Sequence, residues 1–335
     1  MAEVAAGGWQ GVPVLVTGAG GFIGSHLVER LAGLGADVRA LVRYNSRGLR
    51  GHLDGLPAEV QARLKVVSGD VRDSYFVDRV TEGVRCVFHL SSLIAIPYSY
   101  EAPQSYVDTN ISGALNVFQA ALRHKVARVV HTSTSEVYGT AVYTPIDEAH
   151  PLQGQSPYSA SKIGADKLAE SFHRSFELPV ATLRPFNTFG PRQSARAVIP
   201  TIIAQALARD HVELGALDPV RDLTFVDDTV SAFLRMAEVP EAVGETIHVG
   251  TGVGVTIGEL AKRILSLLAV ERPIRTSDER VRPDKSEVRT LLCNPEKAAR
   301  VLGWAPRVTL DDGLERAIAY VRAHLSDYRA EIYNR

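Results

Sequence analysis

Cysteine is scarce in this chain of 335 residues, which holds only Cys86 and Cys293. Two cysteines cannot build a disulfide scaffold, so we expect a protein suited to a reducing compartment. No apolar run reaches the roughly 18 residues that a membrane-spanning helix needs, and residues 1–10 have neither the basic nor the apolar region of a signal peptide. These absences predict a cytoplasmic protein without a membrane partner.

An excess of charge of either sign is also missing. The chain has 37 Lys and Arg against 38 Asp and Glu, a formal net charge of −1. Proteins that bind nucleic acid usually carry net positive charge or a basic stripe, so we expect no nucleic-acid partner. His89 and His131 end predicted strands without neighbours at metal-ligand spacing, so we expect no metal site.

Apolar, β-branched runs alternate with helical patterns over the first half of the chain. Strands are predicted at 12–17, 37–43, 64–67, 86–90, 128–132 and 180–184, and helices at 25–34, 105–124 and 158–176. This alternation predicts βαβ units and an α/β fold, a Rossmann-type doubly wound parallel sheet. From Phe186 onward the alternation loosens and proline becomes frequent, which predicts a smaller mixed α/β C-terminal region.

A glycine-rich turn follows the first predicted strand. Residues 17–24 read TGAGGFIG, with glycines at every third position rather than in the GxGxxG spacing. Glycines allow a tight turn there and let backbone N–H groups approach a diphosphate at the start of a helix. We therefore predict a dinucleotide site, the alternative being a plain tight turn. Its predicted contacts are Gly18, Gly21, Phe22, Ile23 and Gly24.

The end of the second predicted strand bears on the choice of dinucleotide. An acidic residue here would hold the ribose 2′-hydroxyl of NAD, but residues 39–47 contain no carboxylate and offer Arg43 and Arg47. Guanidinium groups suit a 2′-phosphate, which favours NADP over NAD; the alternative is surface arginines beside a bound NAD. After the third strand, Asp70 and Val71 are predicted to contact the adenine.

Two polar stretches carry the predicted chemistry. Residues 132–139 read TSTSEVYG at the end of a strand, and residues 156–162 read SPYSASK at the start of a helix, with Ser156 as N-cap. Tyr158 and Lys162 are four residues apart and share one helix face. We expect the pKa of the Tyr158 phenol to fall because an adjacent ammonium and a cationic nicotinamide favour the phenolate. The pair then forms a general acid–base site.

Taken together, these motifs resemble those of the extended short-chain dehydrogenase/reductases, in the nucleotide-sugar epimerase/dehydratase family. The resemblance covers nearly the whole chain, and its closest likeness is to the sugar-nucleotide 4,6-dehydratases of legionaminic-acid-type pathways. The stretches that carry it are TGAGGFIG, GDVRD, HLSS, TSTSEVYG, YSASK, RPFNTFGPR, RDLTFVDD and RPDKSEV.

The resemblance implies a role for each residue of the polar stretches. Tyr158 would take the proton of the sugar C4 hydroxyl, Thr134 would hydrogen-bond that oxygen, and Lys162 would hold the cofactor ribose. Glu136 would remove the C5 proton before water leaves C6. Ser135 stands where one branch of the family has an aspartic acid for that water loss, so Glu136 is expected to serve both steps.

The resemblance also places the substrate. Asn187, Val198, Arg221 and Arg282 match positions that bind the nucleotide end, where guanidinium groups pair with a diphosphate. It implies a dinucleotide-binding domain at 11–186 with about 224–250, and a nucleotide-sugar-binding region at 187–223 and 251–330. A homodimer through the helices at 105–124 and 158–176 is expected.

Several reactions share these residues. The leading hypothesis is an NAD(P)-dependent 4,6-dehydratase acting on UDP-N-acetylglucosamine or a related nucleotide-linked hexose. A UDP-glucuronate decarboxylase, a C4 epimerase and a 5,6-dehydratase remain alternatives, because they differ only in what happens after oxidation at C4. A more distant alternative is a non-catalytic dinucleotide sensor, although such proteins typically lose the tyrosine or the lysine, and both are present here.

Overall fold

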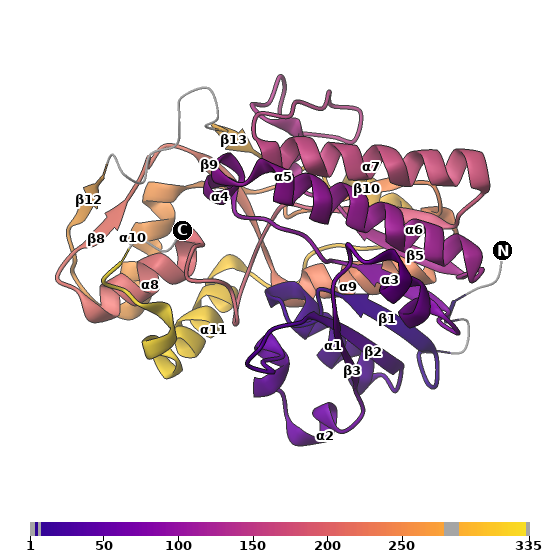
Figure 1. Cartoon of the computed structure of the whole chain (residues 1–335). Helices are drawn as coiled ribbons and strands as arrows, with labels where there is room; N and C mark the ends of the chain where they lie inside the picture. The colour runs from indigo at the N-terminus through magenta and orange to yellow at the C-terminus, as the bar shows by residue number, and fades with distance from the viewer. Residues whose placement is uncertain (1–3, 6–7, 278–287, 333–335) are drawn as a thin grey trace.

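The fold is organised around a seven-stranded parallel sheet, as a computed structural model describing residues 4–5, 8–277 and 288–332 shows (Figure 1). Every neighbouring pair in this sheet is parallel. The predicted Rossmann-type architecture is therefore confirmed. In spatial order the strands are β3 (Lys65–Gly69), β2 (Asp37–Arg43), β1 (Pro13–Thr17), β4 (Cys86–His89), β5 (Arg128–Thr132), β6 (Val180–Pro185) and β10 (Thr246–Val249).

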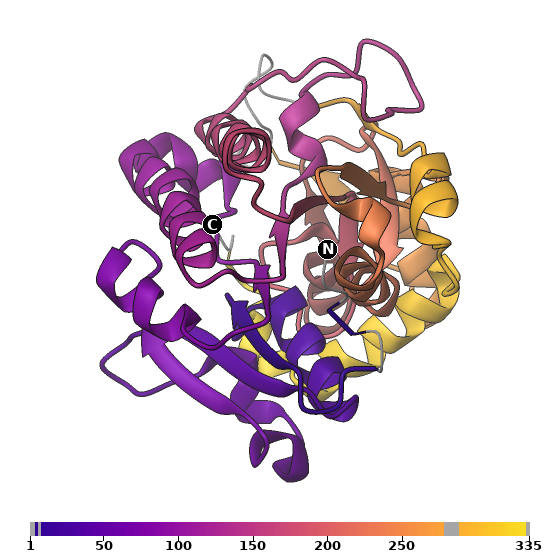
Figure 2. The same ribbon diagram turned by 90° about the vertical axis from the view of Figure 1, so that its right-hand side faces the viewer.

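Helices cover both faces of the sheet (Figures 1 and 2). Successive strand side chains point to opposite faces, so Leu15 packs with the α3, α6 and α7 layer while Val14 and Val16 pack with the α1 and α9 layer. These helices are α1 (Phe22–Gly33), α3 (Ser74–Thr81), α6 (Gly113–Arg123), α7 (Pro157–Phe176) and α9 (Val226–Glu238). Strands buried on both faces explain the continuous apolar runs in the sequence.

The helix predicted at 105–124 forms in three parts. Helix α5 (Pro103–Tyr106) leads into a π-helical turn, η2 (Val107–Ser112), before α6 begins. Within that turn the buried Asn110 side chain donates to the Leu93 carbonyl and to the Ser161 hydroxyl, and it accepts from the Leu93 N–H. Periodicity does not reveal such tertiary hydrogen bonds, which explains why the sequence predicted one regular helix.

The C-terminal part of the chain adds smaller sheets beside the main one. Strand β9 (Val220–Phe225) pairs with β7 (Asn187–Phe189), β11 (Gly254–Thr256) and β13 (Thr290–Leu291), while β8 (Val212–Leu214) pairs with β12 (Ile274–Thr276). Helices α8 (Val198–Ala208), α10 (Ile257–Leu268) and α11 (Leu310–Ala323) pack here. Because β10 returns to the main sheet beside β6, the chain passes between the two regions more than once.

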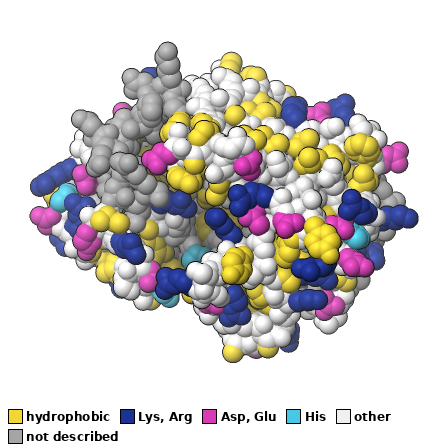
Figure 3. Space-filling view, viewed as in Figure 1, with side chains coloured by type: hydrophobic (Ala, Val, Ile, Leu, Met, Phe, Trp, Pro, Cys, Tyr) yellow, Lys and Arg dark blue, Asp and Glu magenta, His cyan; other side chains and the backbone are white. Residues whose placement is uncertain are grey.

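Short helical elements complete the described part of the chain. They are η1 (Gly51–Gly55), α2 (Ala58–Gln61), α4 (Ile96–Glu101), η3 (Ser135–Tyr138), η4 (Pro240–Ala242), the π-helical η7 (Ala298–Leu302) and η8 (Leu325–Tyr328). None of the described helices is both long and apolar enough to cross a membrane. Charged side chains of both signs are interspersed over the face drawn in Figure 3.

Candidate active site

The predicted glycine turn lies at the carboxyl edge of the sheet, between β1 and α1. Gly18 has a φ of +70°, and a Cβ there would lie 2.9 Å from both the Leu90 carbonyl carbon and the Ser91 nitrogen. A Cβ on Gly24 would collide with the Gly18 carbonyl oxygen. A side chain fits at neither position, so this glycine cradle (residues 18–24) is shaped by backbone alone.

The first turn of α1 is free of side-chain caps. Gly21 is the N-cap without a side-chain hydrogen bond, and the first turn, which begins with Phe22 and Ile23, has no acidic residue. No side chain of the first turn therefore neutralises the positive end of the helix dipole or caps its free N–H groups. This arrangement fits the diphosphate of a dinucleotide.

The ends of β2 and β3 bring Arg43 beside Asp70. Arg43 is paired in register with Gly69 and is exposed, and its charge acts on Asp70. The Asp70 carboxylate is bonded to Arg72 at 2.6 Å, and this hydrogen bond lowers the pKa of Asp70. Val71 is buried, and a Cβ on Gly113 would lie 2.9 Å from its Cγ2 atom. One exposed guanidinium thus stands at the end of β2.

Helix α7 begins where the sequence predicts and carries the tyrosine and lysine. The Ser156 hydroxyl accepts from the Ser159 N–H in a capping box, and proline follows at the first helical position. Tyr158 and Lys162 are 7% and 4% exposed. The Lys162 amine donates to the Thr132 carbonyl at 2.6 Å, which joins α7 to the end of β5.

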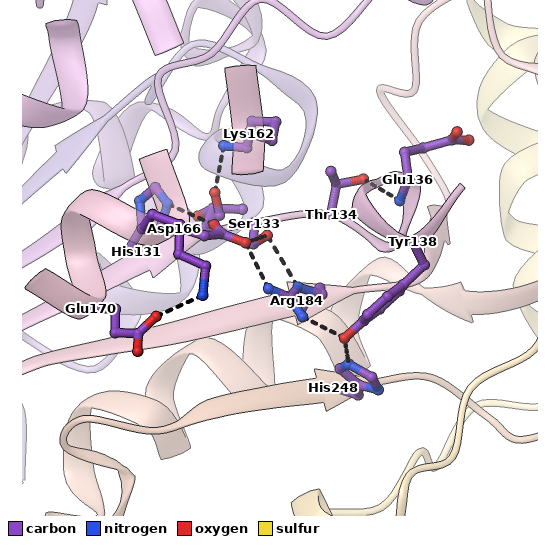
Figure 4. A network of polar contacts seen from close by, with 12 residues as sticks. His131, Ser133, Thr134, Glu136, Tyr138, Lys162, Asp166, Glu170, Arg184 and His248 are labelled. Atoms are coloured by element: carbon purple, nitrogen blue, oxygen red, sulfur yellow. Dashed lines mark hydrogen bonds and ion pairs between the residues drawn. The ribbon is translucent and has the colours of Figure 1, made fainter. Parts of the chain in front are cut away.

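The segment after β5 completes the group. Thr134 caps η3 by accepting from the Glu136 N–H at 3.3 Å, and its hydroxyl hydrogen-bonds that of Tyr158. Ser135 is buried at the first position of η3, and the half-buried Glu136 acts electrostatically on Tyr158. Figure 4 shows Thr134, Glu136 and Lys162 at the end of β5. We call Thr134, Glu136, Tyr158 and Lys162 the tyrosine–lysine site.

The acid–base properties of this site differ from the expectation. Burial raises the pKa of Tyr158; the Thr134 hydrogen bond lowers it and the Glu136 carboxylate raises it. The sequence led us to expect a lowered pKa from Lys162 and a bound cationic nicotinamide together. In the protein chain alone the pKa of Tyr158 is instead raised, because desolvation outweighs the favourable contacts. Burial also lowers the pKa of Lys162 to about 8, an effect that the Asp166 carboxylate opposes.

A buried polar network lies directly behind the tyrosine–lysine site, and sequence reasoning missed it (Figure 4). The Asp166 carboxylate accepts from Ser133 and Arg184, each at 2.6 Å, and contacts the His131 ring nitrogen at 3.2 Å. Arg184 also donates to the Tyr138 hydroxyl. Two signals were available: Asp166 is one turn beyond Lys162, and Arg184 interrupts an apolar strand.

The predicted substrate residues lie in the C-terminal region. Asn187 begins β7, and its buried Oδ1 atom has no hydrogen-bond partner among the described residues. Arg221 on β9 is buried and donates to the Val220 carbonyl at 2.9 Å. Asn187 pairs in register with Leu223, which lies two residues after Arg221 on β9. The side chains of Asn187 and Arg221 therefore project to the same face of this small sheet. Val198 begins α8, and Arg282 lies outside the described residues.

No group of three His, Cys, Asp or Glu side chains is placed to hold a metal ion in the part of the chain that the structure describes. The two clusters that stand out are the glycine cradle and the tyrosine–lysine site. Both lie at the carboxyl ends of parallel strands, where open α/β sheets bind their ligands.

Comparison with known proteins places this arrangement in a family. The family model of GDP-mannose 4,6 dehydratase matches residues 15–317. A UDP-glucose 4-epimerase of Mycolicibacterium smegmatis is 33% identical over 92% of this chain and 98% of its own length. A dTDP-glucose 4,6-dehydratase of an Actinoplanes species is 32% identical over 93% of this chain and 98% of its own length.

A solved structure agrees with these sequence matches. The dTDP-glucose 4,6-dehydratase DesIV of Streptomyces venezuelae, determined with NAD bound, has a TM-score of 0.86 and 31% identity over 94% of this chain and 98% of its own. The sequence matches and the structural match thus point to the same family as the fold and the two clusters at the strand ends. This chain belongs to the extended short-chain dehydrogenase/reductases, in the family of nucleotide-sugar 4,6-dehydratases and epimerases.

Proposed function

We propose that the protein is an NAD(P)-dependent nucleotide-sugar 4,6-dehydratase acting on UDP-N-acetylglucosamine or a related nucleotide-linked hexose. The observation that carries the proposal is that Thr134 and Glu136 stand together at η3, Thr134 hydrogen-bonding the Tyr158 hydroxyl and the Glu136 carboxylate acting electrostatically on it. Oxidation at C4 needs only the phenol and the lysine. Elimination across C5 and C6 needs in addition a carboxylate within the same site.

The glycine cradle fits a nicotinamide dinucleotide, since side chains are excluded from it and the start of α1 is uncapped. When bound, this cofactor supplies a hydride acceptor at C4 and a hydride donor at C6. Lys162 would hold its ribose, with Asp70 and Val71 beside the adenine. The exposed Arg43 favours NADP, since a guanidinium can pair with a 2′-phosphate.

Three residues of the tyrosine–lysine site act directly on the sugar in this proposal. Tyr158 accepts the proton of the C4 hydroxyl as a phenolate, the form that a bound cationic nicotinamide would favour against the effect of burial, while Thr134 holds that oxygen by a hydrogen bond. Glu136 then removes the C5 proton, which the keto group at C4 makes acidic. Ser135 is a far weaker acid than a carboxylic acid, so the protonated Glu136 donates to the hydroxyl that leaves C6.

The nucleotide end belongs to the C-terminal region in this proposal. Asn187, Val198 and Arg221 bind the diphosphate and the base. The buried Asn187 Oδ1 atom, which has no hydrogen-bond partner within the described part of the chain, supports a polar ligand there. The dinucleotide domain comprises residues 11–186 and about 224–250, with the sugar-nucleotide region at 187–223 and 251–330. By likeness to the family, α6 and α7 form the interface of a homodimer.

Reaction in heavy water tests the proposed function. The purified protein is incubated with UDP-N-acetylglucosamine and NADP or NAD in D2O, and the product is followed by mass spectrometry and NMR. A 4,6-dehydratase loses water and gains solvent deuterium at C5. In a parallel reaction with UDP-glucuronate, release of carbon dioxide would instead assign the decarboxylase. An exocyclic alkene formed from UDP-N-acetylglucosamine would assign the 5,6-dehydratase.

The C4 epimerase is the second candidate, favoured by the M. smegmatis relative. Its product keeps the mass of the substrate and takes up no deuterium at C5. The variant Glu136→Gln separates the two within one assay, because it should retain oxidation at C4 while losing water elimination about 100-fold or more. Glu170→Gln is the matched control, since Glu170 is paired on the solvent side of α7. An undiminished elimination in Glu136→Gln would contradict the proposed base.

A further inference from the structure

Five buried polar side chains lie on the face of the sheet beneath α7. Thr17, His89 and His131 are paired in register across β1, β4 and β5, and Arg184 is paired with His248 across β6 and β10. All five stand on the sheet face that packs against α6 and α7, since they alternate with residues of the opposite layer. Buried polar groups are costly unless paired, so each of these side chains needs a partner.

Thr17 and His89 hydrogen-bond each other and His248 bonds the Tyr138 hydroxyl, whereas His131 and Arg184 share Asp166 as their partner. The side chain of Asp166 is 6% exposed and that of Arg184 is 5% exposed, with 2.6 Å between carboxylate and guanidinium. Ser133 donates to the same carboxylate, and the His131 Nε2 atom faces it at 3.2 Å. A carboxylate only accepts, so His131 carries its proton on Nε2. One side chain of α7 therefore holds three groups from the ends of β5 and β6 (Figure 4).

Asp166 stands on the same helix as Tyr158 and Lys162, so its contacts affect where those two side chains lie. Asp166 follows Lys162 by one turn and Tyr158 by two, so the three side chains share one face of α7. The end of β5, which Asp166 binds through His131 and Ser133, leads directly into Thr134. When α7 is held against this end, the Tyr158 phenol and the Lys162 amine are held opposite Thr134. Small displacements of catalytic groups lower the reaction rate strongly.

We propose that Asp166 is a positioning residue for the reaction: it locks α7 to the ends of β5 and β6 and places a buried negative charge one helical turn from the Lys162 amine. This inference rests on the proposed function only for its activity assay. Its geometric part concerns the protein chain itself and can be measured without substrate.

The electrostatic setting supports a role for that charge. The groups that interact electrostatically with the Lys162 amine are the Asp166 carboxylate on α7 and the rings of His89 on β4 and His131 on β5. Arg184 on β6 acts on Asp166 and His131, and Glu136 on η3 acts on Tyr158. Burial lowers the pKa of both histidines, so they are neutral and add no positive charge. Burial would raise the pKa of Asp166, yet Arg184, His131 and Ser133 hold it well below its usual range. The carboxylate is therefore ionised at every working pH and favours the ammonium form of Lys162.

The variant Asp166→Asn tests the proposal. Without the negative charge the pKa of Lys162 falls below its value of about 8, so the ammonium form is lost at lower pH. The alkaline limb of kcat should move about one pH unit toward acid, and kcat at its optimum should fall about 10- to 100-fold. NMR titration of protein labelled with 13C at the lysine Cε, assigned with Lys162→Met, should show the same shift without substrate or dinucleotide.

Two further variants keep the test decisive. Glu170→Gln, on the same helix but at its solvent face, should leave both the pH profile and the titration unchanged. If Asp166→Asn leaves Arg184 unpaired and does not fold, the double variant Asp166→Asn with Arg184→Gln removes both charges and should show a shift in the same direction, reduced by the loss of the guanidinium charge. A loss of kcat without movement of either pH midpoint would overturn the inference. A starting protein that turns over no nucleotide sugar would refute the proposed function and leave the titration valid.

Discussion

The two ends of the candidate active site are built in opposite ways. The glycine cradle uses backbone, because Gly18 and Gly24 have no room for a Cβ and the start of α1 has no side-chain cap. The tyrosine–lysine site uses buried side chains, with Tyr158 and Lys162 backed by the Asp166 network. The first end presents an uncapped helix start without an acidic side chain, whereas the second holds its own charged side chains in the protein interior.

This difference sets what each end should tolerate. At the cradle, an added side-chain atom clashes with neighbouring backbone. Such a substitution should weaken dinucleotide binding and leave the turnover rate of the fully loaded protein nearly unchanged. At the tyrosine–lysine site, isosteric changes preserve shape and remove a proton or a charge, so turnover should fail while binding remains. The variants below test that division.

Tyr158→Phe should have the largest effect. The ring still packs in edge-to-face contact with Tyr106, at 6.3 Å between centroids, but the hydroxyl that exchanges the proton is gone. We expect kcat to fall by about 1000-fold with little change in dinucleotide affinity. Steady-state kinetics and fluorescence titration measure the two quantities.

Tyr75→Phe is the control for this substitution, since Tyr75 is 76% exposed on α3. If Tyr158→Phe retained turnover within twofold, the phenol would not be the proton acceptor. An unchanged biological output of that variant would favour the dinucleotide sensor.

Gly24→Ala should have the next largest effect and the opposite signature. The added methyl group meets the Gly18 carbonyl oxygen, so the cradle must open. We expect the dissociation constant of the dinucleotide to rise about 10-fold, equivalent to about 1.4 kcal/mol, and kcat at saturation to change far less. Isothermal titration calorimetry gives the constant.

Gly33→Ala tests the specificity of this effect. Gly33 ends the same helix, and a Cβ there meets nothing within 4 Å. Equal weakening in both variants would show that helix α1, rather than the close backbone approach, determines the affinity.

Arg43→Ala should have the smallest and most selective effect. Removing an exposed guanidinium at the end of β2 should weaken NADP binding about five- to tenfold and leave NAD binding nearly unchanged, because only NADP carries the 2′-phosphate. Arg174→Ala, an exposed position on α7, controls for net charge. Equal effects on both dinucleotides would remove the predicted preference.

Much of the Rossmann-type sheet was predictable because its strands are short and apolar and because α7 starts at a clear cap. Residues 37–43 and 128–132 coincide with β2 and β5, and Ser156 caps α7 as predicted. The π-helical turn at Val107–Ser112 was not, because it depends on Asn110 bonding to groups remote in sequence. The C-terminal strands are too short for a clear period, so only a mixed region could be predicted there.

The amino-acid sequence by itself determined the glycine turn, the capped tyrosine–lysine helix and the family, because each depends on local spacing. Only the tertiary structure decided that Asp166 meets Arg184, His131 and Ser133, since these groups come from separate strands that the sheet aligns. It also decided the pKa directions of Tyr158 and Lys162. Desolvation depends on what surrounds a group in three dimensions, and no local pattern contains that information.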